Sequence, residues 1–446
     1  MDFRSFLNNR YLKTILAMFF LGLFLYGALV QANYINTDMR MTDQGSYING
    51  VLQLDIQPER LLPRNRMPLY IYFQSLFYKS GMSREAFFIR GKYLNIFISV
   101  IGLIILYFIF RRYLEPVLTV HLWLITAFTV FIFKAGYFQA EILYYLLSFF
   151  AFLLFNLMLV KKNWKAAVLT GLFVALAYLT KASMLLGLLL FLLTVFMQIF
   201  TMLFKQYFLK NKEEKQDFWR GNLSKTIIPV VLVPLVFLAV VSPYIINNKK
   251  TFGRYFYNVN TTFYIWYDSF DDAKKGTNLL ADQRNWPFMP ADKIPSLRKY
   301  FKEHTFSQIY DRLFQGIKMT LFSMRRSYGY YKFILLFTFF LICMLFLERK
   351  KIPDILEKYK WLIGFNLFYF VVNFLACAWY VPIASGNRFV LSLFLPYMFS
   401  CFYLLSVLLK GNKKISSFNF LVVSILIGIE VYDVVFYKII SIYGGA

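Results

Sequence analysis

The residues best suited to chemistry in this sequence are two aspartates, Asp38 and Asp43, which follow the first long apolar run. A carboxylate in this position can act as a general base that takes the proton of an attacking hydroxyl group. The same residues also fit the start of a helix, with Thr42 as its cap and Asp43 beside the positive end of the helix dipole. If the segment is helical, five residues of separation turn the two carboxylates about 140° apart, so only one of them faces a common site.

Basic residues follow within the same polar segment. Arg64 and Arg66 flank one asparagine, and the guanidinium fork binds the oxygens of a phosphodiester or pyrophosphate in bidentate fashion. Lys181 ends a later apolar run and Glu141 begins another; ionisable residues at such positions are costly and often functional. Structural explanations stay open for each: the arginines can anchor lipid headgroups, Lys181 can snorkel, and Glu141 can be a helix N-terminal charge.

The elements that must position these residues are membrane helices. Of the 446 residues, 59% are hydrophobic and only 16% are charged, which is far more apolar surface than a soluble fold of this length needs. In lipid the backbone satisfies its own hydrogen bonds, so runs of roughly 20 apolar residues form helices. We therefore expect an all-α integral membrane bundle, a single domain over residues 1–446. Its expected spans, about eleven, cover residues 14–32, 93–110, 117–133, 138–160, 165–180, 183–204, 226–247, 333–347, 361–380, 389–409 and 417–437.

Short segments rich in lysine and arginine indicate the orientation, since such segments stay in the cytoplasm. With this number of spans they all fall on one side, which puts the N-terminus in the cytoplasm and the C-terminus outside. Two long polar segments, about 33–88 and 248–331, then form outer loops. Each contains an amphipathic stretch, 51–61 and 294–314, that can lie in the interface plane. All the candidate residues above fall at the outer face of the cell membrane.

Composition also excludes several kinds of function. The chain has two histidines and no cysteine cluster, so zinc chemistry with three histidine ligands is excluded. It has no glycine-rich phosphate loop, which indicates a donor held in the membrane and no nucleotide cofactor. The net charge of +26 is spread between spans instead of over one soluble face. It fits contact with membrane lipids or phosphate-bearing substrates and no nucleic acid.

Taken in order, these segments resemble the GT-C superfamily of glycosyltransferases, in particular the branch of the dolichyl-phosphate-mannose protein mannosyltransferases and the bacterial aminoarabinose lipid A transferases. Asp43 stands where that branch has an acidic residue in the first outer loop. Residues 65–70, Asn-Arg-Met-Pro-Leu-Tyr, resemble the pattern Glu-Lys-Pro-Pro-Leu-Tyr, with Arg66 at the basic position.

The resemblance continues along most of the chain. The stretch that ends at Lys181 is similar to Gly-Leu-x-x-Leu-Thr-Lys, and residues 243–253 are similar to Pro-Trp-x-x-Arg-Asn-x-x-x-x-Gly. Near the end, Arg388 with Pro396 resembles the Arg-Tyr pair and downstream proline of a late span.

The sequence also departs from the family pattern. Asn65 stands where the lipid A transferases have a glutamate that can bind metal, which puts a metal site in doubt. Asn247 replaces an arginine, so a phosphate contact can have moved to Lys249 or Arg254. Gln44 replaces the acidic neighbour found in the protein mannosyltransferases, so a protein acceptor is not implied.

The resemblance implies a polyprenyl-phosphate-linked sugar as donor and an inverting transfer outside the cytoplasm to a glycolipid, a polysaccharide or a protein. It implies Asp43 as the base. Phosphate ligands would come from Arg64, Arg66, Lys181 and Arg388, and further substrate contacts from Asp38, Glu141, Asn248 and Arg254. We expect no required cofactor.

Two other functions stay open at this point. A transporter or flippase of lipid-linked sugars would need charged residues near mid-span and, in many such folds, matched halves; the spans here are nearly free of carboxylates, with Glu430 and Asp433 as exceptions. A GT-C-fold polymerase or ligase would instead act on pyrophosphate-linked glycans.

Overall fold

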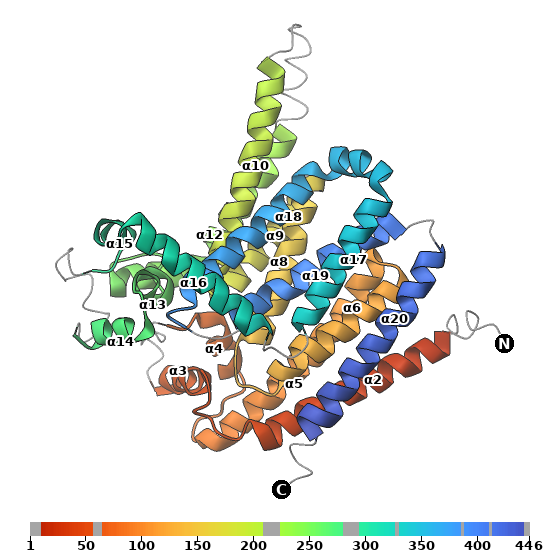
Figure 1. The fold of residues 1–446 in the computed structure, drawn as a ribbon. Helices are drawn as coiled ribbons and strands as arrows, with labels where there is room; N and C mark the ends of the chain where they lie inside the picture. Colours follow the sequence, from red (N-terminus) through yellow and green to blue (C-terminus); the bar gives the residue numbers. More distant parts are fainter. Residues whose placement is uncertain are drawn as a thin grey trace.

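The computed structural model describes residues 10–56, 65–207, 224–279, 294–325, 330–384, 388–409 and 413–440, and within these ranges it is helical without any strand. Figure 1 shows a bundle of long helices with a group of short helices at one end. Among the described residues, eight helices are long and apolar enough to cross a membrane, which confirms a multi-pass membrane protein. They are Ile15–Ile35, Arg84–Tyr113, Pro116–Ala135, Glu141–Lys161, Met184–Phe204, Thr226–Phe252, Arg349–Tyr380 and Val390–Leu409.

The three remaining expected spans also coincide with helices. Trp164–Thr180 (α9) and Tyr331–Leu347, within α17 (Tyr330–Leu347), are apolar but shorter than the eight. The last expected span falls on α20 (Lys413–Tyr432), which continues into the π-helical segment Asp433–Ile440. A total of eleven spans stays a prediction.

Several helices extend past the apolar cores of the expected spans. The first span, α2 (Arg10–Val30), continues through the π-helical segment η1 (Gln31–Ile35), and α5 (Arg84–Tyr113) begins well before residue 93. Ser83 fixes this early start, since its hydroxyl accepts from the Ala86 N–H at 3.2 Å. We call the segment between Ile35 and Arg84 the first outer segment, and the segment between α12 (Ser224–Phe252) and α17 the second outer segment. The names follow the predicted side of the membrane, and that side stays a prediction.

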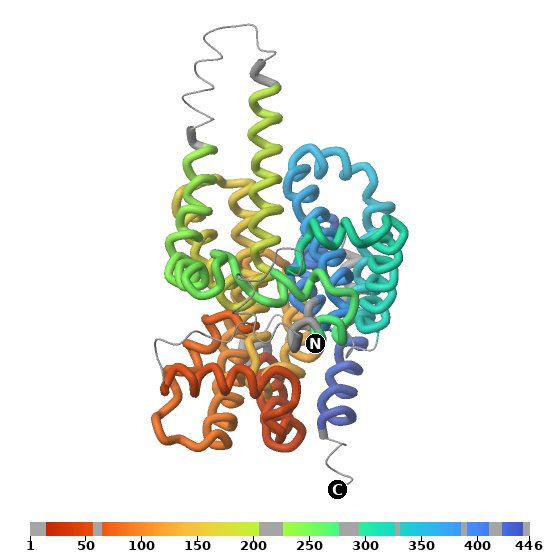
Figure 2. Tube along the Cα trace, turned by 90° about the vertical axis from the view of Figure 1, so that its left-hand side faces the viewer, coloured from red at the N-terminus to blue at the C-terminus, as the bar shows by residue number. Residues whose placement is uncertain are grey.

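Both outer segments fold into helices, most of them short. The first carries α3 (Gln44–Ile56) and α4 (Pro68–Ser75); the expected amphipathic stretch 51–61 is helical to Ile56, and the rest lies outside the described residues. The second carries α13 (Val259–Thr262), α14 (Phe270–Leu279), α15 (Leu297–Glu303) and α16 (Phe306–Arg325). The expected stretch 294–314 is thus divided between two helices. Figure 1 shows α3, α13, α14 and α15 on one side of the bundle, and Figures 1 and 2 show these helices away from the projecting end of α10 (Met184–Tyr207).

The helices that carry the candidate site residues pack closely against their neighbours. The helix α9 follows α8 (Glu141–Lys161) after Asn163, whose side chain caps it by accepting from the Ala166 N–H at 2.8 Å. A methyl group added to Gly171 of α9 would lie 2.7 Å from the Val233 carbonyl of α12, so glycine allows these backbones to approach. In the same way Gly316 of α16 touches the Ala378 carbonyl of α18 (Ile352–Tyr380). The second outer segment is thereby fixed to a membrane helix.

Candidate functional site

The carboxylate of Asp43 lies directly before α3, whose first turn bonds to the Asp43 carbonyl through the N–H groups of Ser46 and Tyr47 at 3.1 and 3.4 Å. Its side chain forms an ion pair with Arg66, with 2.5 Å between Asp43 Oδ1 and Arg66 Nη2. The two side chains are only 21% and 13% exposed. The structure thus brings together the residue predicted as base and a residue predicted to bind phosphate.

Arg66 is held from several sides. Its guanidinium lies 5.4 Å from the centre of the Tyr47 ring, a favourable cation–π distance. The Asn65 carbonyl accepts from Asn260 Nδ2 at 3.3 Å, so the second outer segment contacts the first beside Arg66. Arg66 Nε is buried and has no hydrogen-bond partner among the described residues. The helix α4 begins two residues later at Pro68, where the missing N–H costs nothing.

Asp38 has a different setting from Asp43. It is exposed and lies in a turn, where its Oδ1 accepts from the Arg40 N–H at 2.7 Å and its carbonyl from the Met41 N–H at 3.1 Å. The helical arrangement considered for the two aspartates does not apply, because α3 starts only at Gln44.

A second ion pair lies at the ends of α8 and α9. Lys181 Nζ is 3.0 Å from Glu141 Oε1, and Glu141 is only 2% exposed. The ammonium also lies 5.6 Å from the ring of Tyr144, whose hydroxyl is 2.8 Å from Ser183 Oγ. The Lys181 side chain therefore points to a buried carboxylate. A snorkelling side chain would instead point to the membrane surface.

The helix α4 connects the surroundings of the two ion pairs. It packs against α9 and carries the buried Tyr70. Burial raises the pKa of Tyr70 well above its ordinary value; hydrogen bonds with Gln74 and Asn95 oppose this shift, while the negative charge of Glu141 adds to it. The phenol therefore stays protonated, and it donates to Asn95 Oδ1 at 3.1 Å.

The remaining predicted site residues are placed as follows. Asn248 is buried, and its Nδ2 lies 3.4 Å from both the Tyr255 and the Tyr257 carbonyl. Arg254 is exposed, with its guanidinium 5.5 Å from the Phe263 ring. A substrate contact by either residue stays a prediction. Arg64 lies outside the described residues, and Arg388 begins α19 (Arg388–Leu409) with a side chain that is also outside them.

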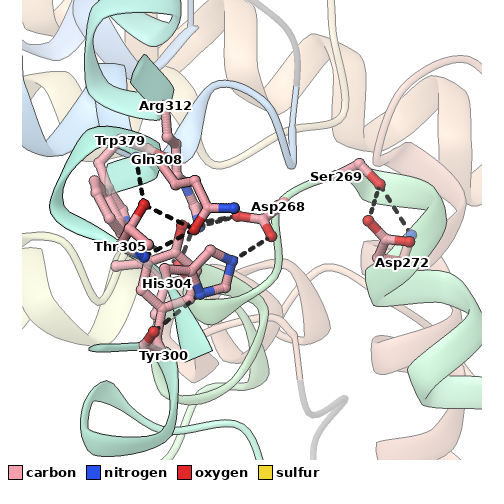
Figure 3. A network of polar contacts seen from close by, with 10 residues as sticks. Asp268, Ser269, Asp272, Tyr300, His304, Thr305, Gln308, Arg312 and Trp379 are labelled. Carbon is pink, nitrogen blue, oxygen red and sulfur yellow. Dashed lines mark hydrogen bonds and ion pairs between the residues drawn. The ribbon is translucent and has the colours of Figure 1, made fainter. Parts of the chain in front are cut away.

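Sequence reasoning missed a network of polar contacts at the C-terminal end of α18 (Figure 3). Asp268 accepts from the Tyr300 hydroxyl at 2.7 Å and from Arg312 Nη1 at 3.2 Å, and its other oxygen is 2.9 Å from His304 Nε2. The Trp379 ring stacks 4.2 Å from the Arg312 guanidinium. Burial alone would lower the pKa of His304, but the Tyr300 carbonyl and the Asp268 carboxylate outweigh it and raise that pKa. The sequence feature that could have indicated this network is His304, one of only two histidines in the chain.

The part of the candidate site that the structure describes offers no ligand set for a divalent cation. Within the described ranges, no three His, Cys, Asp or Glu side chains gather closely enough to hold a metal ion. The positive charge next to Asp43 is the guanidinium of Arg66, which would repel a cation at that carboxylate.

The sequence matches no protein-family model, and it matches no curated protein. Among solved structures, the chain is similar to the archaeal oligosaccharyltransferase AglB from Archaeoglobus fulgidus in complex with an inhibitory peptide and a dolichol-phosphate. The match has a TM-score of 0.49 and 11% sequence identity, and it covers 94% of this chain and 56% of that one. The chain therefore spans about half the length of this neighbour.

Proposed function

We propose that this protein is a membrane glycosyltransferase that moves a sugar from a polyprenyl phosphate to an acceptor hydroxyl outside the cytoplasm. The observation that carries the proposal is the ion pair of Asp43 and Arg66, which joins a candidate base to a candidate phosphate ligand. The motif resemblance to GT-C glycosyltransferases supports it, because Asp43, Arg66 and Lys181 all stand at matching positions.

In the proposed reaction, an acceptor hydroxyl attacks the anomeric carbon of the donor sugar from the side opposite the phosphate. The new bond joins the acceptor oxygen to that carbon, and the bond from carbon to phosphate oxygen breaks with inversion. The hydroxyl proton passes to an Asp43 carboxylate oxygen. The polyprenyl phosphate leaves as the other product.

Charge on the leaving phosphate would be neutralised by the two cations. The Arg66 guanidinium would bind phosphate oxygens through N–H groups that now face Asp43, so the donor phosphate and the Asp43 carboxylate would compete for this cation. Lys181 is 18% exposed and already carries a favourable contact with Glu141. Groups that stabilise developing charge in a dry site typically contribute a few kcal/mol each.

The proposal is tested by reconstituting the purified protein in liposomes with polyprenyl-phosphate sugars and a mixture of acceptor lipids. Transfer of label to an acceptor, lost in Asp43→Asn, is the expected result. Movement of a fluorescent lipid-linked sugar across the bilayer without transfer would instead show a flippase. Mass spectrometry of the lipid retained on gentle purification separates a monophosphate donor from the pyrophosphate of a polymerase or ligase.

A further inference from the structure

A buried lysine bonds to the start of the segment that carries Asp43. Lys92 lies on α5 and is 3% exposed. Its ammonium donates to the Ala32 carbonyl at 2.5 Å and to the Asn36 carbonyl at 2.8 Å, and it lies 4.3 Å from the Phe88 ring. The carbonyls at the end of a helix lack intrahelical partners and carry partial negative charge. Lys92 therefore binds the backbone carbonyls at which the first membrane helix ends and the first outer segment begins.

The next link joins Asn36 to Gln44. Their amides form a reciprocal pair: Asn36 Nδ2 donates to Gln44 Oε1 at 2.8 Å, and Gln44 Nε2 donates to Asn36 Oδ1 at 2.8 Å. Both residues are fully buried. The same amides also bond to the chain between α7 (Ile132–Ala135) and α8, through the Gly136 carbonyl and the Phe138 N–H, both at 2.8 Å. Gln44 directly follows Asp43 in sequence.

The residue before Asp43 is held in an unusual backbone conformation. Thr42 has a φ of 57°, in the left-handed region that a β-branched residue rarely adopts. Such a conformation persists only where the surroundings determine it. Here the Thr42 hydroxyl accepts from Gln139 Nε2 and donates to the Met41 carbonyl. Asp43 is thus fixed between Thr42 and Gln44, both of which have polar side-chain partners.

We propose that Lys92 is a positioning residue for Asp43, acting through Asn36 and Gln44 to direct the carboxylate at Arg66. Its catalytic consequence rests on the proposed function, whereas its geometric consequence does not. The alternative is that Lys92 merely stabilises the packing of α5 on α2. In that case its removal would lower the stability of the bundle without changing how Asp43 faces Arg66.

The first test measures geometry without activity. The three native cysteines are replaced, and cysteines are introduced as Asp43→Cys with Arg66→Cys for a short bis-methanethiosulfonate crosslinker. The crosslink should form readily with Lys92 and fall sharply with Lys92→Met. It should be retained in the control Lys165→Met, an exposed lysine at the start of α9. An unchanged crosslinking rate in a folded Lys92→Met protein overturns the proposal.

The second test uses the intact Asp43 and Arg66. In Lys92→Met, kcat should fall by about 10²-fold, the effect of misplacing a reacting group by roughly 1 Å, while the donor KM is unchanged. Lys92→Arg, which keeps the charge, should recover part of this loss. A loss shared equally by kcat and donor binding, or no loss, contradicts positioning. If the wild-type protein transfers no sugar but the crosslink still depends on Lys92, the proposed function fails and the positioning role stands.

A second variant covers the case in which Lys92→Met does not fold. Gln44→Glu keeps the size of the side chain but removes the Nε2 donor to Asn36. It should also reduce the crosslink between positions 43 and 66. Full crosslinking in Gln44→Glu would show that the path from Lys92 to Asp43 does not pass through this pair and would overturn the proposal as stated.

Discussion

Arg66 Nη2 lies 2.5 Å from Asp43 Oδ1, although 23 residues separate them in the chain. The carboxylate and the guanidinium are therefore paired with each other before any substrate is bound. A donor phosphate that binds the guanidinium competes with the carboxylate for its N–H groups. In the proposed reaction, donor binding would thereby free an oxygen of Asp43 to receive the acceptor proton.

The first prediction concerns the base. Asp43→Asn keeps the size of the side chain but removes the site for the proton, so sugar transfer should fall by about 10²- to 10⁴-fold. Donor binding should persist, because Arg66 and Lys181 remain. The measurement is the transfer rate in liposomes, with donor binding determined on the same preparation.

Asp38→Asn provides the matched control for this substitution. Asp38 is exposed and bonds to the Arg40 N–H of its own turn, so transfer should stay close to that of the wild type. An inactive Asp38→Asn beside an active Asp43→Asn would reverse the assignment. If both variants are active, the first outer segment does not supply the base.

The second prediction concerns the phosphate ligands. Replacing Arg66 by Met should weaken donor binding by roughly tenfold to a hundredfold, which corresponds to about 1.5–3 kcal/mol for a hydrogen bond to a charged group. Lys181→Met should be made together with Glu141→Gln, because Glu141 is 2% exposed and a buried charge without its partner destabilises the fold. Binding of a polyprenyl-phosphate sugar is measured by native mass spectrometry. Unchanged binding in both variants, with Lys165→Met as the reference, would contradict the assignment.

The third prediction concerns orientation. The positive-inside rule puts the second outer segment outside the cell and the turn after α8 in the cytoplasm. With the native cysteines replaced, Ser307→Cys should react with an impermeant thiol reagent on intact cells, and Lys161→Cys should react only after permeabilisation. Both positions are exposed. The opposite labelling pattern would place the candidate site in the cytoplasm.

The sequence predicted best those features that depend on long apolar runs. The spans coincide with helices, and Glu141 and Lys181 fall at the ends of two of them, because length and hydrophobicity alone determine where such helices form. Their mutual ion pair joins residues 40 apart in sequence. Two charged residues at the ends of successive antiparallel helices meet at the same face, so this contact follows from topology.

The features that could not be predicted depend on distant polar partners. Nothing local indicates that Lys92 bonds to carbonyls 56 and 60 residues away. Nothing local indicates either that the helix starts only at Gln44, after both Asp38 and Asp43. Thr42 adopts its positive φ only where residues far along the chain hold it, with Gln139, 97 residues away, bonded to its hydroxyl.

The fourth prediction concerns metal ions. Asn65 stands where the lipid A transferases that the sequence resembles have a glutamate, and a neutral amide is a weaker ligand than a carboxylate for Mg²⁺ or Ca²⁺. Transfer should therefore survive exhaustive chelation. The measurement is the transfer rate with EDTA and after addition of Mg²⁺ or Mn²⁺. Complete loss on chelation, restored by one divalent ion, would contradict the prediction.

The fifth prediction concerns pH and the network around Asp268 (Figure 3). His304 Nδ1 lies 2.9 Å from the Tyr300 carbonyl and His304 Nε2 lies 2.9 Å from Asp268 Oδ2. Both partners are acceptors, so both ring nitrogens are satisfied only when the imidazole is protonated. Burial opposes this, yet the two hydrogen bonds raise the pKa of His304 above its ordinary value of 6.5. For Asp268, burial is outweighed by the hydrogen bonds of Tyr300 and His304 and by the charge of Arg312, which lower its pKa. Asp268 therefore stays ionised over the range in which His304 titrates.

The sign of the effect follows from these directions. A group whose pKa is raised on folding stabilises the folded state at low pH, and this contribution is lost as pH rises through the folded pKa. Amide hydrogens around Asp268 and in α15 should therefore exchange faster at about pH 8.5 than at about pH 6 after correction for intrinsic rates, since histidine titrates in this range. His304→Gln should remove the difference, and Asp311→Asn, an exposed carboxylate on α16, should leave it intact. Hydrogen exchange measured by mass spectrometry on the detergent-solubilised protein tests this. Equal protection at both pH values in the wild type would show that the ion pair does not hold α15 to Asp268.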